Sequence, residues 1–343
     1  MTHYIIRRCL QAIPSLLIIS LILFFLAQNM GDPLATLGGR TRLRPADRER
    51  LTRQMGLDKP DIVQYLYWLV GNDWAKIDKD GDGVAETPGQ RQGVMRGDFG
   101  MSIITRRPAW DLIAERLPNT LLLMLPAEFL IIVLSLAIGI YSALRQYSLI
   151  DNIVTSFSFI GYSMPVFWLA LMLMYIFAVN FKAWGWPYFP TVGMFEPEVG
   201  KTTQQVLWHM VLPIATLTII QVAAYSRYVR AAMLEVVHTD YIRTATAKGL
   251  PRRMVIYGHA LKNASLPLVT LVGLDLPLLL AGAVVTESIF AWPGMGRLFI
   301  DHAYKADVAV LMGILIMISV AVIVFQIITD VVYAYLDPRI HLT

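Results

Sequence analysis

The sequence contains very little cysteine and very little charge. It has 343 residues, of which one is cysteine and 16% are Asp, Glu, Lys or Arg. The single Cys9 excludes an internal disulfide. The low charge, together with 56% hydrophobic residues, lies outside the composition of soluble globular proteins. The chain is therefore predicted to be a membrane protein, and its net charge of +4 gives no indication of a nucleic acid partner.

Motifs of common enzyme classes are also missing. The sequence has no G-x-x-x-x-G-K-[ST] phosphate loop and no H-E-x-x-H, and its six histidines are scattered. We therefore expect a non-catalytic chain that does not itself hydrolyse ATP and needs no cofactor for catalysis. A cleavable signal peptide is not expected, because the apolar run after Arg7 and Arg8 ends near Ala27 without a suitable cleavage site.

Six apolar segments are long enough to cross about 30 Å of hydrocarbon, which takes about 20 helical residues. They are Cys9–Ala27, Leu121–Leu144, Ile153–Val179, Trp208–Ala224, Leu266–Phe290 and Val308–Val332. The fourth is the weakest, since Pro213 interrupts it. The predicted fold class is therefore an all-α, polytopic membrane protein with six transmembrane helices.

The distribution of arginine and lysine predicts the orientation. An even number of spans puts both termini on one side, and Arg7, Arg8, Arg145 and the segment 227–262 indicate that this side is the cytoplasm. Residues 30–118 then form a sizeable extracytoplasmic insertion, although its many arginines favour the reversed orientation. We keep it outside because long segments translocate largely regardless of charge.

The predicted spans and their orientation divide the chain into three regions. Residues 1–29 are the cytoplasmic N-terminus and first membrane helix, 30–118 the extracytoplasmic region, and 119–343 a five-helix membrane core. Within the second region, Pro45–Met55 is predicted to be an exposed helix and Ile62–Val70 an amphipathic one.

The segment 240–249 is predicted to be a short cytoplasmic helix with a signal at each end. Thr239 or Asp240 can accept hydrogen bonds from the first free amides, while Gly249 and Pro251 end the helix. The segment is not apolar enough to cross a bilayer.

One face of this short helix is suited to docking. The residues on that face are Tyr241, Thr244, Ala245 and Lys248. Its small side chains would let another protein surface approach the backbone closely. We therefore predict a docking helix.

The segment between Ile77 and Pro88 has the alternating acidic residues of a calcium loop. Its ligands would be the carboxylates of Asp78, Asp80, Asp82 and Glu86 and the backbone carbonyl of Val84. The twelfth position, where a complete EF-hand loop has Glu, is Gly89. Two interpretations stay open: a structural calcium ion and a solvated acidic turn.

Four carboxylic acids lie within the apolar segments, where charge is costly. They are Glu128, Asp275, Glu287 and Asp330. Asp275 lies in mid-segment beside Pro277, so Asp275 and Glu128 are candidates for a transport pathway. The alternative for all four is an interhelical hydrogen bond that holds the helices together.

Three segments around the docking helix, and further landmarks along the chain, together carry a family resemblance. The three segments are Arg230–Leu250, His259–Asn263 and Leu266–Pro267. The landmarks are Gly31–Pro33, Gly56–Pro60, Gly97–Ser102, Arg116–Thr120, Ser163–Trp168, Glu287–Phe290, Pro293–Gly294 and Asp337–Arg339. With them the chain closely resembles the permease subunits of ABC peptide importers, in the dipeptide and oligopeptide branch, of the kind that stands first of the two permeases.

The resemblance implies a role for the docking helix. In that family this segment, the EAA loop, is a coupling helix that sits in a cleft of an ATPase subunit. The implied coupling residues are Tyr241, Arg243, Thr244, Ala245, Lys248 and Gly249, of which 243–245 stand in the E-A-A positions. Arg243 departs from the pattern at the first of these positions, and the insertion 71–94 is not part of the usual pattern.

The resemblance also implies partners and a location. The partners are a second homologous permease, two ATPase subunits that bind ATP, an extracytoplasmic substrate-binding protein, a peptide substrate and membrane lipid. The location is the inner membrane of a bacterial or archaeal cell.

Other functions stay open from the residues alone. A membrane scaffold or receptor would also have six helices and a docking loop, and a secondary transporter would carry its own ion-coupled site. Within the importer interpretation, the alternative cargoes are nickel complexes, opines, glutathione and saccharides.

Overall fold

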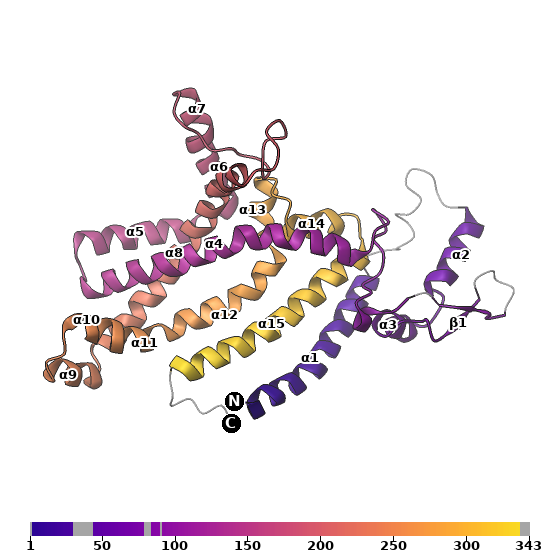
Figure 1. Ribbon diagram of the computed structural model, residues 1–343, viewed down its shortest axis with the longest axis horizontal. Helices are drawn as coiled ribbons and strands as arrows, with labels where there is room; N and C mark the ends of the chain where they lie inside the picture. The colour runs from indigo at the N-terminus through magenta and orange to yellow at the C-terminus, as the bar shows by residue number, and fades with distance from the viewer. Residues whose placement is uncertain (1, 30–43, 79–83, 90, 337–343) are drawn as a thin grey trace. The chain divides into compact units, whose positions relative to one another are not determined.

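The computed structural model describes residues 2–29, 44–78, 84–89 and 91–336, which are mainly helical (Figure 1). Six of the described helical segments are long and apolar enough to cross a membrane. They are Tyr4–Gln28, Ala109–Leu144, Val166–Ala183, Thr203–Val237, Leu266–Ile289 and Val308–Leu336. The predicted all-α class with six spans is confirmed.

The chain forms two compact units. The first contains residues 1–8, 119–296 and 321–343, and the second contains residues 9–118 and 297–320. Helices α1 (Thr2–Gln28), α4 (Ala109–Leu144), α14 (Met295–Ala303) and α15 (Val308–Leu336) contribute residues to both units.

The second unit contains the small elements between the first two spans. They are α2 (Pro45–Met55), α3 (Asp61–Leu69), β1 (Lys76–Ile77), β2 (Thr87–Pro88) and the 3₁₀ turn η1 (Val94–Arg96). Proline suits the first turn of α2, and Gly56 ends that helix with φ 70°. Both helices predicted here are confirmed, and Tyr65 and Trp68 of α3 pack with Phe24 of α1.

The first unit is built around the long helix α8. Helix α8 covers Thr203–Val237, and among the other helices of this unit are α5 (Leu149–Ser163), α6 (Val166–Met174), α7 (Phe181–Ala183), α12 (Leu266–Ala281) and α13 (Val284–Ile289), with a π-helical segment η2 (Tyr175–Asn180) between α6 and α7. Helices α5, α6 and α12 each contact α8. Contrary to the expectation from Pro213, α8 continues through that residue as one helix of 35 residues, as membrane helices can.

Small residues bring the helices of this unit close together. A Cβ atom added at Gly139 of α4 would lie 2.7 Å from Val229 of α8, and one at Gly161 of α5 would lie 3.2 Å from Ala223. Helix association in a bilayer depends on such close packing, because lipid supplies no hydrophobic driving force between helices.

The expected third span Ile153–Val179 is wrong as a single helix. Helix α5 ends at Ser163, Met164 is extended with ψ 129°, and α6 starts after Pro165. Proline disfavours the helical conformation of the residue before it, which breaks the chain here. The third span therefore starts at Val166, and α5 is a separate helix that packs along α8.

A fully buried carboxyl group organises the segment after α12. Glu287 is 0% exposed and accepts a hydrogen bond of 2.9 Å from Thr120 Oγ1. Cβ atoms added at Gly282 or Gly294 would approach a Glu287 oxygen to 2.6 or 2.5 Å, and one at Gly296 to 3.1 Å. These three glycines form a cradle around the Glu287 side chain.

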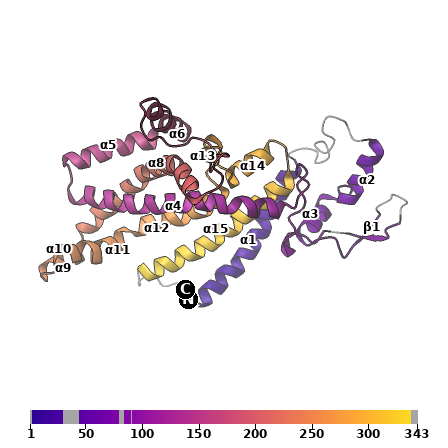
Figure 2. The ribbon, with the colours of Figure 1, turned by 45° about the horizontal axis from the view of Figure 1, so that its top comes forward.

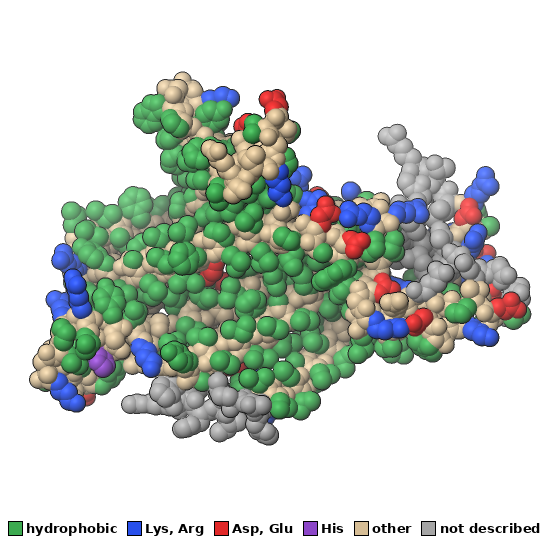
Figure 3. All heavy atoms as spheres, viewed as in Figure 1, with side chains coloured by type: hydrophobic (Ala, Val, Ile, Leu, Met, Phe, Trp, Pro, Cys, Tyr) green, Lys and Arg blue, Asp and Glu red, His purple; other side chains and the backbone are tan. Residues whose placement is uncertain are grey.

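Helices α9 (Asp240–Ala247), α10 (Arg252–Met254) and α11 (Leu261–Ala264) gather at one end of the first unit (Figures 1 and 2). In Figure 3, hydrophobic side chains cover the middle of the visible face of this unit, while lysine and arginine side chains gather at that end. This distribution is expected where helix ends leave the hydrocarbon region.

Candidate coupling site

Helix α9 lies where the sequence predicted the docking helix. Gly249 has φ 79° and its amide bonds to Thr246 O at 3.0 Å, so the glycine ends the helix as expected. The amino-terminal cap differs from the expectation. The Thr239 hydroxyl accepts no amide hydrogen bond and instead donates to Val236 O at 2.6 Å.

The two faces of α9 have different environments. Ile242 and Ala245 are 5% and 7% exposed and belong to a hydrophobic core that includes Met233 and Val255. The prediction that Ala245 lies on the docking face is therefore wrong. Ile242 is the signal in the sequence that marks the inward face, because it lies three residues before Ala245.

The remaining predicted coupling residues lie at the surface of the chain. They are Tyr241, Arg243, Thr244, Lys248 and Gly249. The Arg243 guanidinium lies 3.5 Å from Asp240, and both side chains are largely exposed. These residues form the outer face of α9.

A hydrogen bond joins α9 to α11. Asn263 Nδ2 donates to Tyr241 Oη at 2.7 Å, and Asn263 directly precedes the last residue of α11. The π-helical segment η3 (Val255–Ala260) between α10 and α11 also contacts α9. Displacement of α9 would therefore be felt at the start of α12.

An ion pair with a buried carboxylate joins α8 to α5, which the sequence did not predict. Arg230 donates from Nε and Nη2 to the two Asp151 oxygens, each at 3.0 Å, and the Asp151 side chain is 3% exposed. The backbone amide of Tyr147 donates to the same carboxylate at 2.9 Å. The Arg230 hydrogen bonds hold the pKa of Asp151 below its ordinary value. Seventy-nine residues separate the partners, so no local pattern could have found the pair.

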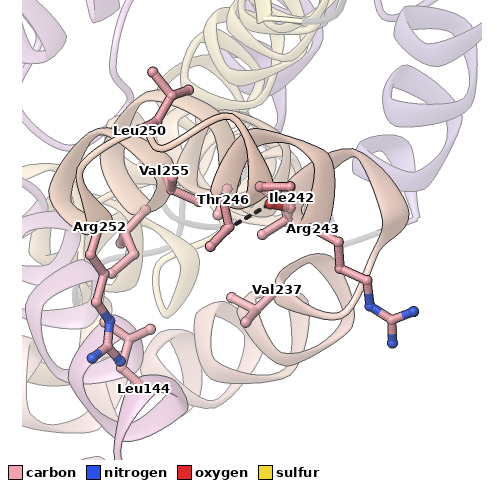
Figure 4. A pocket seen from close by; sticks show the side chains of 11 residues that line it. Leu144, Val237, Ile242, Arg243, Thr246, Leu250, Arg252 and Val255 are labelled. Carbon is pink, nitrogen blue, oxygen red and sulfur yellow. Dashed lines mark hydrogen bonds between the residues drawn. The ribbon is translucent and has the colours of Figure 1, made fainter.

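A pocket of about 610 Å³ lies behind α9 (Figure 4). Its lining is mainly apolar and includes Leu144, Val237, Ile242 and Val255. Arg243 also lines the pocket, and in Figure 4 its guanidinium group extends away from the other labelled side chains. The inner face of α9 therefore borders both a packed hydrophobic core and a cavity.

The predicted pathway residues lie together within the first unit. Tyr225 of α8 donates to Asp275 Oδ2 of α12, and Gln221 of α8 donates to the same atom at 3.1 Å. Glu128 of α4 is 5% exposed, and the charge of Asp275 repels a charge on Glu128. Asp330 of α15 is instead paired with Arg8 at 3.1 Å.

The acidic loop is only partly described. Asp80 and Asp82 lie outside the described residues, as does Gly83. Strand β1 pairs antiparallel with β2, with Ile77 opposite Thr87, so the two ends of the loop are held together. Among the described residues, no group of three or more His, Cys, Asp or Glu is arranged to hold a metal ion.

Comparison with known families covers nearly the whole chain. The model for the inner membrane component of binding-protein-dependent transport systems matches residues 135–342, and the model for the N-terminal part of such components matches residues 1–124. The chain belongs to this family. This family of inner membrane components, together with the six apolar helices, makes the chain a multi-pass protein of the cell membrane.

Individual relatives of this membrane component are similar over their full length. An oligopeptide transport system permease protein, AppB of Bacillus subtilis, is 41% identical over 343 residues, which cover 99% of this chain and 100% of AppB. The dipeptide permease protein DppB of Escherichia coli K12 is 34% identical over 363 residues, covering 99% of each chain. A di/tripeptide permease protein DppB of Pseudomonas aeruginosa is 34% identical over 360 residues, again covering 99% of each.

Proposed function

We propose that this chain is the permease subunit of an ATP-driven importer for peptides, in which it forms half of the translocation pathway with a second homologous permease. Two separate ATPase subunits bind and hydrolyse ATP, and an extracytoplasmic binding protein delivers the cargo. The family membership and the peptide permeases named above support this proposal. The alternative cargoes, which are nickel complexes, opines, glutathione and saccharides, have no support from those relatives.

The outer face of α9 is the proposed contact with an ATPase subunit, on the cytoplasmic side. The observation that carries this role is the division of α9 into a face buried against its own chain and a face that is largely exposed. The packed face makes α9 rigid with respect to the ends of α8 and α12. The outer face, with Tyr241, Thr244 and Lys248, is available to a partner.

Two connections carry the movement of α9 into the membrane part. The Tyr241–Asn263 bond leads to α11 and then to α12. The Asp151–Arg230 pair ties the last third of α8 to α5. Closure of the ATPase subunits on ATP binding would displace α9 and so move the cytoplasmic ends of these helices as a group.

Disulfide cross-linking in intact membranes tests the contact. Cys9 is the single cysteine, so Cys9→Ser gives a background for placing cysteine at Thr244 or Lys248. Each variant is expressed with its ATPase subunits, which carry cysteines along the cleft proposed to receive α9. We expect cross-links at both positions, and we expect the yield to change when ATP is added.

The matched control is cysteine at Tyr257, an exposed residue of η3 that lies outside α9. It should give no cross-link. If Tyr257 cross-links while Thr244 and Lys248 do not, α9 is not the ATPase contact and the proposal is wrong.

We also propose that the acidic loop binds one structural calcium ion, outside the membrane. The antiparallel pairing of β1 and β2 supports this, because it brings the ends of the loop together before any ion binds. Calorimetry on the purified complex should detect calcium binding at millimolar concentration. Substitution of both Asp78 and Glu86 by Ala should abolish the signal, and absence of heat in the wild type contradicts the proposal.

A further inference from the structure

The middle of the first unit contains two carboxyl groups on different membrane helices. Asp275 lies near the middle of the span Leu266–Ile289. Both hydrogen bonds that it accepts, from Tyr225 and Gln221, end on Oδ2. Asp275 is partly exposed. A carboxyl group that is partly exposed at this depth is expected to face a polar surface or an aqueous pathway, because exposure to lipid costs several kcal/mol.

Glu128 of α4 is almost completely buried. Its Oε1 atom is buried and has no hydrogen-bond partner among the described residues. Asp275 is close enough for its charge to repel that of Glu128. Two like charges in a medium of low dielectric constant favour the binding of a cation between or beside them.

The neighbouring arginines do not supply that cation. Arg227 of α8 lies over the rings of Phe159 and Tyr162, with 5.2 and 5.1 Å to the centroids. Arg230 is bonded to Asp151. In the described parts of the chain, no Lys, Arg or His forms an ion pair with Glu128 or Asp275, whereas Asp330 in another span pairs with Arg8. The complementary cation is therefore expected to come from outside the chain.

We propose that Asp275, together with Glu128, binds the ammonium group of a peptide as the peptide crosses the membrane. This inference rests on the proposed function, because it takes a peptide with a free amino terminus as the cargo. The ammonium group supplies the positive charge and the hydrogen-bond donors that the two carboxylates lack. Tyr225 and Gln221 hold Asp275 in position through Oδ2, which leaves Oδ1 for the cargo.

The test measures uptake and ATP hydrolysis separately in liposomes that contain the complete transporter. The binding protein is supplied preloaded with radiolabelled dialanine. We expect Asp275→Asn and Glu128→Gln to lower uptake per ATP hydrolysed at least about tenfold, while ATP hydrolysis stimulated by the binding protein is retained. A tenfold loss corresponds to about 1.4 kcal/mol of lost interaction. Asp275→Glu, which keeps the charge, should retain most of the uptake.

Asp330→Asn is the matched control, because it also removes a carboxylate from a membrane helix but one that already has its own cation. It should keep uptake per ATP within about twofold of the wild type. If Asp275→Asn and Glu128→Gln also stay within twofold, the ammonium site does not exist. If Asp275→Glu is as defective as Asp275→Asn, the role is structural and the inference is wrong.

A second measurement uses the wild-type protein and so does not depend on the folding of any variant. Dicyclohexylcarbodiimide labels carboxyl groups in membranes, and mass spectrometry reports which residue is labelled. We expect dialanine delivered by the binding protein to reduce labelling of Asp275, and unchanged labelling overturns the inference. Failure of the proposed function is recognised differently, because the wild-type transporter would then take up no dialanine at all.

Discussion

Two carboxyl groups bond to side chains of the same helix, α8, and they have opposite environments. Asp151 bonds to Arg230 with both oxygens and is buried, so its charge is neutralised within the chain. Asp275 bonds to the neutral groups of Tyr225 and Gln221 and has no cation among the described residues. The presence or absence of a counter-ion within the chain distinguishes a carboxylate that holds helices together from one that is suited to bind a ligand. A charged residue in a membrane helix is therefore understood only when its counter-ion is known.

The largest change in stability is expected when the carboxylate of Asp151 is removed. We expect Asp151→Asn to destabilise the protein by about 3 kcal/mol, because it leaves the Arg230 charge without its partner. The measurement is chemical or thermal unfolding of the purified protein in detergent. The double variant Asp151→Asn with Arg230→Gln should recover part of the loss, and equal losses in the single and double variants would contradict the role of the pair.

The pH dependence follows from the lowered pKa of Asp151. A carboxyl group with a lower pKa in the folded state contributes its full stabilisation above its ordinary pKa of about 3.9, and loses it as the pH falls through the lowered value. The stability difference between the wild type and Asp151→Asn should therefore be constant from neutral pH to about pH 5 and shrink only below about pH 4.

The second prediction compares the two faces of α9. Ala245→Leu should destabilise the protein by about 2 kcal/mol, since the larger side chain must fit into a packed core. Ala247→Leu, on the exposed side of the same helix, should change stability by less than about 0.5 kcal/mol. Similar melting temperatures for the two variants would show that Ala245 is not buried by its own chain.

The third prediction concerns the end of α9. Gly249→Ala should cost about 1 kcal/mol because φ is 79°, a conformation that residues with a Cβ disfavour. Steric contact plays no part, since a Cβ atom there would meet nothing within 4 Å. Gly258→Ala is the control, because its Cβ would make one ordinary contact of 3.8 Å with Met254 and its φ is not positive. Equal unfolding free energies for the two variants would mean that the left-handed turn is not needed.

Asp275→Asn should change the stability of the protein only slightly. The Asn side-chain oxygen still accepts the bond from Tyr225, and no cation is left unpaired, so we expect less than about 1 kcal/mol. Compared with Asp151→Asn in the same unfolding assay, this variant sharpens the contrast between the two carboxyl groups. A loss as large as that of Asp151→Asn would remove the contrast.

The sequence predicted those features that depend on neighbouring residues. The six spans follow from the length of apolar runs, and the end of α9 follows from Gly249. The division of the third span was not predicted, although Pro165 in the sequence already favoured an extended conformation of Met164.

Features that depend on distant residues could not be predicted. The burial of Ala245 depends on its packing with a core that includes Met233 and Val255, and the partner of Asp151 comes from another helix. The pathway role of Asp275 and Glu128 stays a prediction, and the hydrogen bonds of Asp275 to Tyr225 and Gln221 became known only from the structure. The calcium ligands and the ATPase contact stay predictions.

The cradle around Glu287 brings three glycines against one side chain. A methyl group at Gly282 or Gly294 would lie 2.6 or 2.5 Å from a Glu287 oxygen, so it would displace this side chain and with it the bond to Thr120. Substitution at Gly282 or Gly294 is therefore coupled to the presence of Glu287. A homologue with a smaller residue in place of Glu287 would gain room for a Cβ at position 294, where the three nearest atoms all belong to Glu287, whereas Cβ atoms at Gly282 and Gly296 would still meet backbone atoms at 2.5 and 2.7 Å.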